Sequence, residues 1–266
     1  MSRAFDRLNH NLLMIKLMDR KLPSCLVNLL YCWYSKLFSF IKWGNGLSIL
    51  FHITVGVRQG GTLSPSFFAI FVDSILNKLE KSMLGCHISG ICLNSLMYAD
   101  DLVLLSVSIC DLQSLVNMFL HELDTIDMIV NCRKSACLRI GNRHSVHVQN
   151  IIIGTDCVPR EKEIKYLGII ILSTKKFTIN LQKAKQRYFR ALNAIFRKVG
   201  LNTSPMVLCS LINSFCLPIL LYGAEAVLWT NKMLSSIEYT YSQAFMKIFR
   251  TFDRKIIEYC QYSIIN

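Results

Sequence analysis

The spacing of apolar residues predicts that helices and strands alternate along the first two thirds of the chain. Apolar positions three or four residues apart are typical of a helix with one buried face, whereas continuous or alternating apolar runs are typical of strands. The pattern predicts helices at residues 8–22, 24–34, 64–79 and 112–126. It predicts strands at residues 36–43, 47–54, 95–106 (two strands around a central turn), 136–140, 146–153 and 164–172.

Local signals set several of the expected ends. The first helix is expected to stop at Pro23, and Ser24 is expected to cap the second. Gly44-Asn45-Gly46 is a hairpin signal between two apolar runs. After a glycine-rich loop, Ser64 followed by Pro65 predicts the N-cap and the first turn of the third helix.

Beyond about residue 177 the pattern becomes helical, and it begins with the basic stretch LQKAKQRYFRALNAIFRK at residues 181–198. No repeat or low-complexity linker separates the two kinds of pattern. We therefore expect an α+β part that covers residues 1–174 and an α-helical part that covers residues 175–266.

One segment, residues 207–229, is apolar enough to resemble a membrane span. It is long enough to cross a bilayer, yet it contains Asn213, Pro218 and Glu225. A buried helix that is kinked at the proline is the expected structure, and a membrane protein is the alternative. No membrane partner is expected on this interpretation.

The charge of the chain is unevenly distributed. Of the 266 residues, 52% are hydrophobic and 18% charged, which excludes a disordered chain. Residues 159–200 contribute a net +9 to the formal charge of +13. Such a basic stretch favours a polyanionic partner, with nucleic acid first and an anionic membrane surface second. A solvated basic helix face is the simpler alternative.

Cysteine and histidine give no sign of a zinc site. The eleven cysteines include no CxxC pair, so they are expected to act as small hydrophobic residues in a reducing compartment. His144 and His147 lie three residues apart, but no other ligand completes a set. Residues 1–10 lack the apolar stretch of a signal peptide, and we expect an intracellular protein, with nucleus and cytoplasm both left open.

Two adjacent carboxylates, Asp100 and Asp101, interrupt an apolar region at a predicted strand turn. At a separation of about 4 Å they repel by on the order of 4 kcal/mol with an effective dielectric constant near 20. The neighbouring sequence offers no Lys or Arg to neutralise them, and a divalent cation would supply the positive charge. Two carboxylates at a hairpin tip are what a two-metal phosphoryl-transfer site requires. A solvent-exposed acidic turn is the alternative.

Six segments in a fixed order place this turn in a wider pattern. They are Ala4-Phe5-Asp6 with Asn9-His10, Gly56-Val57-Arg58-Gln59-Gly60-Gly61-Thr62-Leu63-Ser64-Pro65, Tyr98-Ala99-Asp100-Asp101, Asn131-x-x-Lys134-Ser135, Tyr166-Leu167-Gly168 and PILLYGAE at residues 218–225. In order and spacing the chain resembles the reverse transcriptases of non-LTR (LINE-like) retrotransposons over nearly its whole length. The resemblance implies a right-hand polymerase palm, an antiparallel sheet with packed helices, followed by an α-helical thumb, with the fingers largely missing.

The resemblance also implies roles at the reacting centre. Asp100 and Asp101 would hold the Mg²⁺ ions, two in the family, that bind a deoxynucleoside triphosphate and activate the primer 3′-hydroxyl. Lys134 would protonate or neutralise the leaving pyrophosphate, with a plain surface lysine as the alternative. Phe5 would crowd the 2′-carbon of the nucleotide. The amide of Gln59 and the backbone of Gly60 would contact the nucleotide, with Arg58 as a structural residue or a template contact.

The remaining implied contacts concern the RNA template and DNA primer. Tyr166-Leu167-Gly168 would press on the primer backbone. The helix at 181–198, with Tyr188 and Phe189 among its cations, would lie against the minor groove of the template–primer duplex. The cations expected to contact phosphates, without reading bases, are Lys183, Lys185, Arg187 and Arg190.

One position departs from the family. Its first palm motif, Asp-x-x-x-Ala-Phe-Asp, starts with a metal ligand that would fall one residue before Met1. Asp6 is expected to cap or support the following helix rather than to replace that ligand. A polypeptide of these 266 residues is therefore expected to polymerise poorly or not at all, and the second metal site is in doubt. A nucleic-acid-binding remnant without catalysis is the alternative function.

Overall fold

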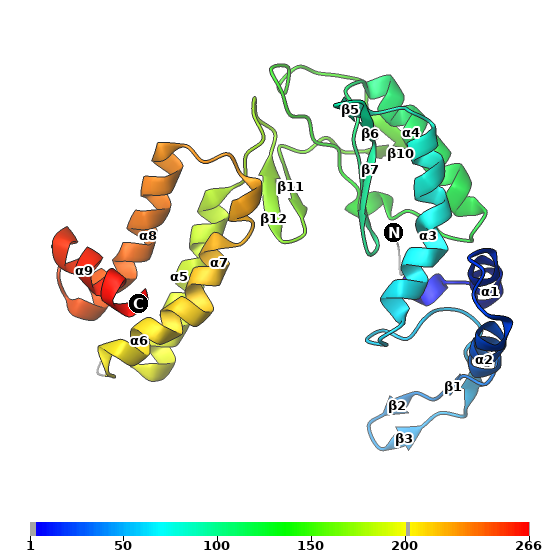
Figure 1. Cartoon of the computed structure of the whole chain (residues 1–266), viewed down its shortest axis with the longest axis horizontal. Helices are drawn as coiled ribbons and strands as arrows, with labels where there is room; N and C mark the ends of the chain where they lie inside the picture. The colour runs from blue at the N-terminus through cyan, green and yellow to red at the C-terminus, as the bar shows by residue number, and fades with distance from the viewer. Residues whose placement is uncertain (1–3, 201–202, 266) are drawn as a thin grey trace. The chain divides into compact units, whose positions relative to one another are not determined.

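The computed structural model describes residues 4–200 and 203–265, which form two compact units (Figure 1). The first unit comprises the described part of Met1–Cys137 together with Val148–Pro159. The second unit comprises Leu138–His147 and the described part of Arg160–Asn266. Helices and short antiparallel strand pairs make up the first unit, and one strand pair with five α-helices makes up the described part of the second. The expected α+β class is confirmed.

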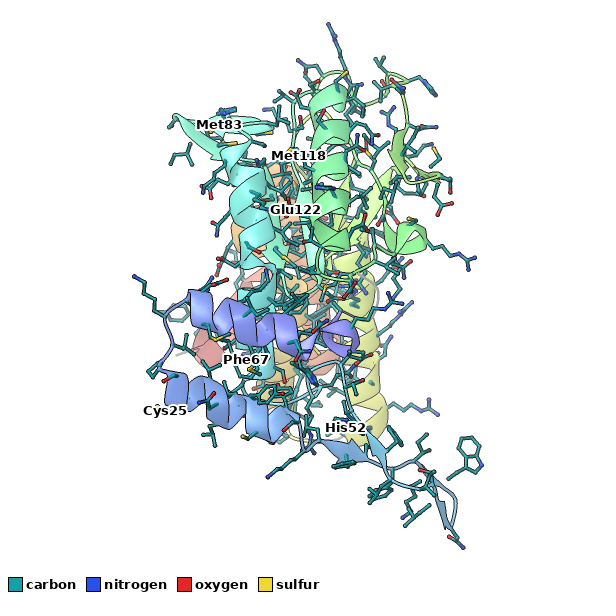
Figure 2. All side chains as sticks on the ribbon, turned by 90° about the vertical axis from the view of Figure 1, so that its right-hand side faces the viewer. Cys25, His52, Phe67, Met83, Met118 and Glu122 are labelled. Atoms are coloured by element: carbon teal, nitrogen blue, oxygen red, sulfur yellow. The ribbon has the colours of Figure 1, made fainter. Side chains whose placement is uncertain are left out.

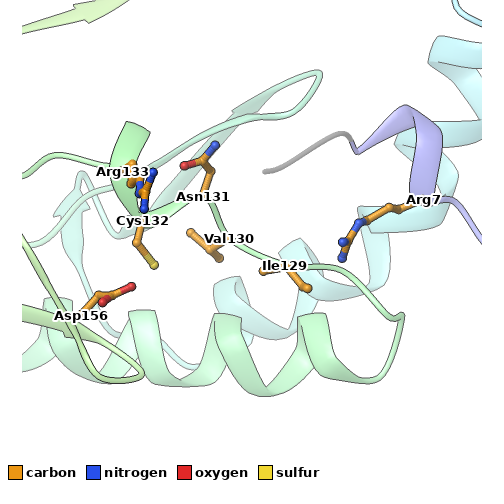
Figure 3. Close-up of a pocket in the computed structure, with 7 residues that line it drawn as sticks. All are labelled: Arg7, Ile129, Val130, Asn131, Cys132, Arg133 and Asp156. Carbon is orange, nitrogen blue, oxygen red and sulfur yellow. The ribbon is translucent and has the colours of Figure 1, made fainter.

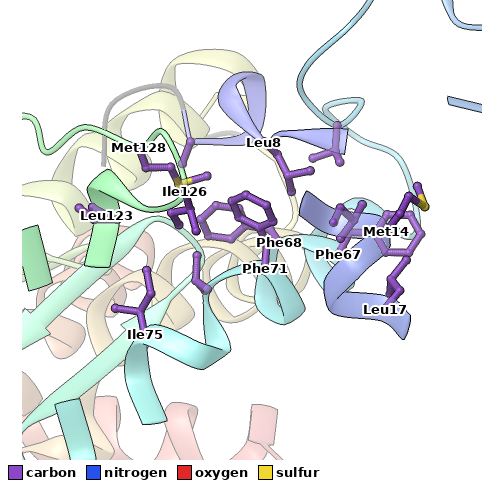
Figure 4. Packing of buried hydrophobic residues seen from close by; sticks show 14 of the residues in the cluster. Leu8, Met14, Leu17, Phe67, Phe68, Phe71, Ile75, Leu123, Ile126 and Met128 are labelled. Carbon is purple, nitrogen blue, oxygen red and sulfur yellow. The ribbon is translucent and has the colours of Figure 1, made fainter. Parts of the chain in front are cut away.

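Four α-helices surround the core of the first unit. They are α1 (His10–Asp19), α2 (Ser24–Tyr34), α3 (Ser64–Lys81) and α4 (Ile109–Asp124), with 3-10 turns at Phe5–Arg7 and Cys132–Lys134. Helix α3 contributes most to the core, because its apolar residues recur every three or four positions on one face. Figure 4 shows Phe68, Phe71 and Ile75 of α3 among Leu8 and Leu123. Lys78 of α3 donates to Glu122 of α4 at 2.6 Å, and Figure 2 labels Glu122 between these helices.

The strands of the first unit form separate two-stranded antiparallel ladders. They are β1 (Phe38–Ser39) with β4 (Phe51–His52), β2 (Lys42–Trp43) with β3 (Gly46–Leu47), β5 (Cys86–Ile88) with β6 (Ile91–Leu93), β7 (Ser95–Tyr98) with β8 (Asp101–Leu104), and β9 (Ile151–Ile153) with β10 (Asp156–Val158). Among the described residues these pairs do not join into the single antiparallel sheet that the resemblance implied. The expected strand at 136–140 is not formed, although the amide of Cys137 donates to the carbonyl of Pro159 at 2.9 Å.

Two expected helix caps are wrong. Pro23 holds the N-cap position of α2, so Ser24 is the first helical residue and its side chain caps nothing. Ser64 likewise opens α3, but its hydroxyl donates to the carbonyl of Arg58 at 2.6 Å. The Ser64 hydroxyl therefore stabilises the preceding loop and does not cap the helix. Ser108 does cap α4, by accepting from two backbone amides of its first turn.

The second unit contains the β11 (Glu163–Tyr166) and β12 (Ile169–Leu172) hairpin and the helices α5 (Leu181–Val199), α6 (Pro205–Leu211), α7 (Leu217–Leu221), α8 (Asn231–Phe249) and α9 (Arg254–Ile265). Its core is built from Tyr188, Leu192, Leu208, Ile212 and Phe245. Burial raises the pKa of Tyr241, on α8, to about 12. The expected boundary near residue 174 stays a prediction; by packing, the β11–β12 hairpin lies with the helices.

The apolar segment after α5 is a helix interrupted before its proline. A π-helical turn, Ile212–Cys216, separates α6 from α7, and Pro218 follows it at the start of α7. Proline has no N–H, so the regular helical ladder cannot continue through this position. The helix is thus interrupted directly before the proline at which a kink was expected. Pro205–Ala226 is long and apolar enough to cross a membrane by length and composition alone, and 28% of its most apolar window is buried. The segment thus buries only one face.

Candidate active site

The two adjacent carboxylates lie at a hairpin turn, as the sequence predicts. Tyr98 pairs with Asp101 across the β7–β8 ladder, so Ala99 and Asp100 form a two-residue turn. Ala99 has a φ of +51°, an uncommon conformation for a residue with a Cβ atom. Asp100 is half-buried and Asp101 is exposed. The hairpin therefore presents two carboxylates side by side from a constrained turn.

A buried asparagine anchors this hairpin to α3. The side chain of Asn94, 2% exposed, donates to the carbonyl of Leu79 at 2.6 Å near the C-terminal end of α3. From there β7 runs back along α3 (Figure 1). Met97 and Leu102, on either side of the turn, pack against the core cluster that contains Phe68.

The Ala4-Phe5-Asp6 segment and the glycine-rich loop are joined by backbone hydrogen bonds. The amide of Val57 donates to the carbonyl of Phe5, and that of Gly56 to the carbonyl of Leu8, both at 2.7 Å. Gly56 has a φ of +92°, and a Cβ atom there would lie 2.8 Å from the carbonyl oxygen of Asp6. Only glycine allows the two segments to approach this closely.

Side chains of the same two segments also meet. The amide of Gln59 donates to the carboxylate of Asp6 at 3.1 Å. Asn9, not Asp6, caps α1, because its side chain accepts from the amides of Asn11 and Leu12. The Phe5 ring stacks on Phe68 of α3, with centroids 4.9 Å apart. Phe5 thus has one ring face fixed against α3 at the edge of the core.

The loop before α3 leaves one backbone position open. The carbonyl of Arg58 accepts from the amide of Gly61 and from the Ser64 hydroxyl, so the backbone of Arg58 is structural. Its side chain is exposed. Gly60 has a φ of +80°, and a Cβ atom there would have no neighbour within 4 Å. The Gln59-Gly60 backbone can therefore be approached from solution.

Lys134 ends a short turn that is separate from the hairpin tip. Asn131 accepts the Lys134 amide at 3.3 Å, and the Ser135 hydroxyl donates to the Asn131 carbonyl, while the Lys134 side chain is exposed. A cavity of about 280 Å³ lies beside this turn (Figure 3). Its lining residues are Arg7, Ile129, Val130, Asn131, Cys132, Arg133 and Asp156. Burial and the Asp156 carboxylate raise the pKa of Cys132. No motif or spacing in the sequence pointed to Asp156 as a residue of this pocket.

The carboxylate oxygens at the hairpin tip are of the kind that binds Mg²⁺, but two side chains are fewer than a two-metal site needs. Carboxylates are the hard donors that Mg²⁺ prefers, and Asp100 and Asp101 supply two of them. Across residues 4–200 and 203–265, no three His, Cys, Asp or Glu side chains gather where they could hold a metal ion. The tip thus resembles part of a two-metal site.

In the second unit, the Tyr166-Leu167-Gly168 segment is a tight hairpin turn. Tyr166 pairs with Ile169, so Leu167 and Gly168 are the two turn residues, with φ of +45° and +84°. The Arg187 guanidinium donates to the carbonyl of Gly168 at 2.7 Å. The Tyr222 hydroxyl donates to the carbonyl of Leu167 at 2.9 Å. Segments far apart in sequence therefore meet at this turn.

The cations of α5 divide into two groups. Lys185 is half-buried and donates to the hydroxyl of Ser236, and Arg187 binds the turn described above. Lys183 is exposed, 3.9 Å from Glu163, and Arg190 is fully on the outer face. The exposed face forms a stripe at helical spacing: Lys183, Gln186, Arg190, Asn193 and Arg197. The sequence had predicted Lys183, Lys185, Arg187 and Arg190 as one phosphate-contacting group, without Arg197.

A protein-family model described as reverse transcriptase (RNA-dependent DNA polymerase) matches residues 1–171. That match covers well over half of the chain and includes the carboxylate hairpin, the glycine-rich loop and the Tyr166-Leu167-Gly168 turn. The chain belongs to the reverse transcriptase family. Reverse transcriptases generally use divalent metals, which agrees with the donors at the tip of the β7–β8 hairpin.

Relatives of this reverse transcriptase chain come from retrotransposable elements. It is 28% identical over 189 residues to the Retrovirus-related Pol polyprotein from type-2 retrotransposable element R2DM of Drosophila melanogaster, over 67% of this chain and 18% of that protein. It is 25% identical over 244 residues to the RNA-directed DNA polymerase from mobile element jockey of Drosophila funebris, and the match covers 87% of this chain and 26% of that protein. A type-1 retrotransposable element R2 polyprotein of Nasonia vitripennis is 26% identical over 177 residues, 63% of this chain and 17% of that protein.

The predicted likeness to reverse transcriptases of non-LTR retrotransposons is confirmed by these relatives. The chain spans between 17% and 26% of the length of the three relatives named. The reverse transcriptase match ends at residue 171, so the described helices of the second unit lie beyond it.

Proposed function

We propose that this chain is the palm and thumb portion of an RNA-directed DNA polymerase, with little of the fingers. Residues 1–174 would form the palm and residues 175–266 the thumb. The observation that carries the proposal is the convergence of three motifs on one core. Phe5 stacks on Phe68, the glycine-rich loop is hydrogen-bonded to the segment that contains Phe5, and Met97 and Leu102, which flank the carboxylate turn, pack against the same core.

The proposed reaction is attack of a primer 3′-hydroxyl on the α-phosphate of a deoxynucleoside triphosphate, with release of pyrophosphate. Asp100 and Asp101 would hold Mg²⁺, which when bound supplies positive charge against the triphosphate and lowers the pKa of the attacking hydroxyl. Lys134, exposed at the end of its turn, would donate a proton to the pyrophosphate or neutralise it.

Nucleotide selection would fall to the joined segments around Phe5. The Phe5 ring, supported from one side by Phe68, would crowd a 2′-hydroxyl and so favour deoxynucleotides. Gly60, open to solution, would let the backbone approach the nucleotide. The Gln59 amide, held by Asp6, would contact it from a fixed position, and the Arg58 side chain would lie close by.

Template and primer would bind through the second unit. The Tyr166-Leu167-Gly168 turn would contact the primer backbone, and the exposed stripe of α5 would contact phosphates without reading bases. Lys183 and Arg190 have the exposure that this role needs, whereas Lys185 and Arg187 have protein partners. No membrane partner is part of the proposal.

A second candidate function is nucleic-acid binding without polymerisation. It is favoured by the number of donors: no three His, Cys, Asp or Glu side chains gather around a metal position within residues 4–200 and 203–265, whereas the two-metal site of this family employs three carboxylates. The third would come from an aspartate four residues before Ala4. The two functions make different predictions for a primed RNA template.

Primer extension with Mg²⁺ distinguishes them. We would compare residues 1–266 with a longer polypeptide that supplies this aspartate and a fingers segment. We expect extension by the longer polypeptide only, and an at least hundredfold loss of rate on Asp100→Asn, because the metal site loses charge. Asp124→Asn, on the exposed surface of α4, is the matched control and should retain the rate. Extension that survives Asp100→Asn would refute the polymerase assignment.

A further inference from the structure

The turn between β11 and β12 has a backbone conformation that its sequence does not favour. Leu167 and Gly168 both have positive φ, the signature of a type I′ hairpin turn. Such turns are usually Asn-Gly or Asp-Gly, since left-handed φ is unfavourable for a residue such as leucine. A leucine keeps this conformation only where its surroundings impose it, and such residues gather at binding and active sites.

Both carbonyls of the turn are held by side chains from other elements. The Tyr222 hydroxyl donates to the Leu167 carbonyl at 2.9 Å, and the Arg187 guanidinium donates to the Gly168 carbonyl at 2.7 Å. These donors are 55 and 19 residues distant in sequence from their acceptors. A Cβ atom at Gly168 would lie 3.2 Å from the Tyr222 ring, so the ring also lies against the turn.

The segment that carries Tyr222 is itself tightly fitted to the hairpin. Gly223, with a φ of +75°, lies so close to Ile169 that a Cβ atom there would meet its side chain at 2.3 Å. Tyr222 and Gly223 are the centre of the PILLYGAE stretch, for which the sequence alone offered no physical role. The hairpin supplies one: this stretch packs against β12 and donates a hydrogen bond to the turn.

We infer that Tyr222 and Arg187 are positioning residues, which fix the Leu167-Gly168 turn in the conformation that contacts the primer. The inference rests on the proposed function and moves Arg187 from the phosphate-contacting group to the support of the turn. A turn that is already fixed in its bound conformation loses less conformational freedom when the primer binds. Removing either hydrogen bond should therefore weaken binding to a primer end more than binding to duplex in general.

Equilibrium binding of the 266-residue chain tests this with two conservative variants. Tyr222→Phe removes only the hydroxyl, and Arg187→Lys keeps the charge but loses the guanidinium. Affinity is measured for an RNA–DNA primer–template with a recessed 3′-end and for an uninterrupted RNA–DNA duplex of equal length. We expect both variants to lower the preference for the recessed end by roughly three- to tenfold. Tyr239→Phe and Arg254→Lys, both at exposed positions outside the site, should leave it unchanged.

Hydrogen exchange of the amides at 166–169, measured without nucleic acid, tests whether Tyr222 and Arg187 hold the turn, independently of any effect on primer binding. We expect faster exchange in both test variants, at unchanged global unfolding. Faster exchange with an unaltered end preference would mean that the contacts serve folding alone and would overturn the positioning role. Unchanged exchange would show that the two side chains do not hold the turn. If the unaltered chain binds no primer–template, the proposed function fails and the positioning role with it, while exchange still reports on the support of the turn.

Discussion

Single residues hold the parts of the candidate site in place. Gly56 permits the contact between the Phe5–Leu8 segment and the glycine-rich loop, because a Cβ atom would overlap the carbonyl of Asp6. The Gln59–Asp6 hydrogen bond then links the side chains of these segments. Sequence motifs identified these residues as a group but did not reveal that Asp6 would take Gln59 as its partner. Partners of this kind depend on packing between segments some 53 residues apart.

Asn94 offers the sharpest test at this scale. Its side chain is 2% exposed and satisfies the Leu79 carbonyl. Asn94→Leu should lower the free energy of unfolding by about 0.5–1.5 kcal/mol, because it removes a buried hydrogen bond that links the segment before β7 to α3. Chemical denaturation measures this. Asn77→Leu, at an exposed position on α3 with a hydrogen bond to Asp73, is the control and should change stability by less than about 0.5 kcal/mol. Equal losses in both variants would contradict the anchoring role.

Elements followed the sequence where their signals were local. Helix α2 has the predicted bounds, and the turns of the β2–β3 and β7–β8 hairpins occur where Gly, Asn or a carboxylate pair interrupted apolar runs. The sequence failed where an outcome depended on a distant partner. Asp6 was expected to cap or support α1 but accepts from Gln59, 53 residues away, and Arg187 was expected to face nucleic acid but binds Gly168, 19 residues away. Helical spacing alone does not reveal which of two polar faces meets another element.

The hairpin between α2 and α3 carries a prediction at the scale of elements. The far end of this hairpin extends past His52 and away from the helices (Figure 2). Its large side chains are exposed, with Trp43 at 87% and Ile49 at 88%. Exposed apolar patches of this kind promote association. Trp43→Ser with Ile49→Ser should reduce self-association, measured by sedimentation, and change the free energy of unfolding by less than about 0.5 kcal/mol. A large loss of stability would mean that these side chains are buried in solution.

At the scale of the whole molecule, charge is concentrated where the second unit begins its helices. Residues 159–200 contribute a net +9 of the total +13, and α5 carries much of it. The structure shows that this excess is not one binding surface, because Lys185 and Arg187 are turned to protein partners. Composition predicted a polyanionic partner for the stretch as a whole, yet on α5 it is the exposed stripe, not Lys185 or Arg187, that is open to such a partner.

Salt dependence of nucleic-acid binding tests that division. Each phosphate contact contributes about 0.9 to the slope of the logarithm of affinity against the logarithm of salt concentration on duplex DNA. Changing Lys183, Arg190 and Arg197 together to Gln should therefore make this negative slope shallower, by up to ~3. The matched change of Lys185 to Gln and Arg187 to Gln should lower stability and primer-end preference but leave the slope nearly constant, because those cations already bind Ser236 and Gly168. A slope that falls mainly with the second pair would reverse the assignment of the two faces of α5. A slope that neither change alters would make the exposed stripe a solvated surface.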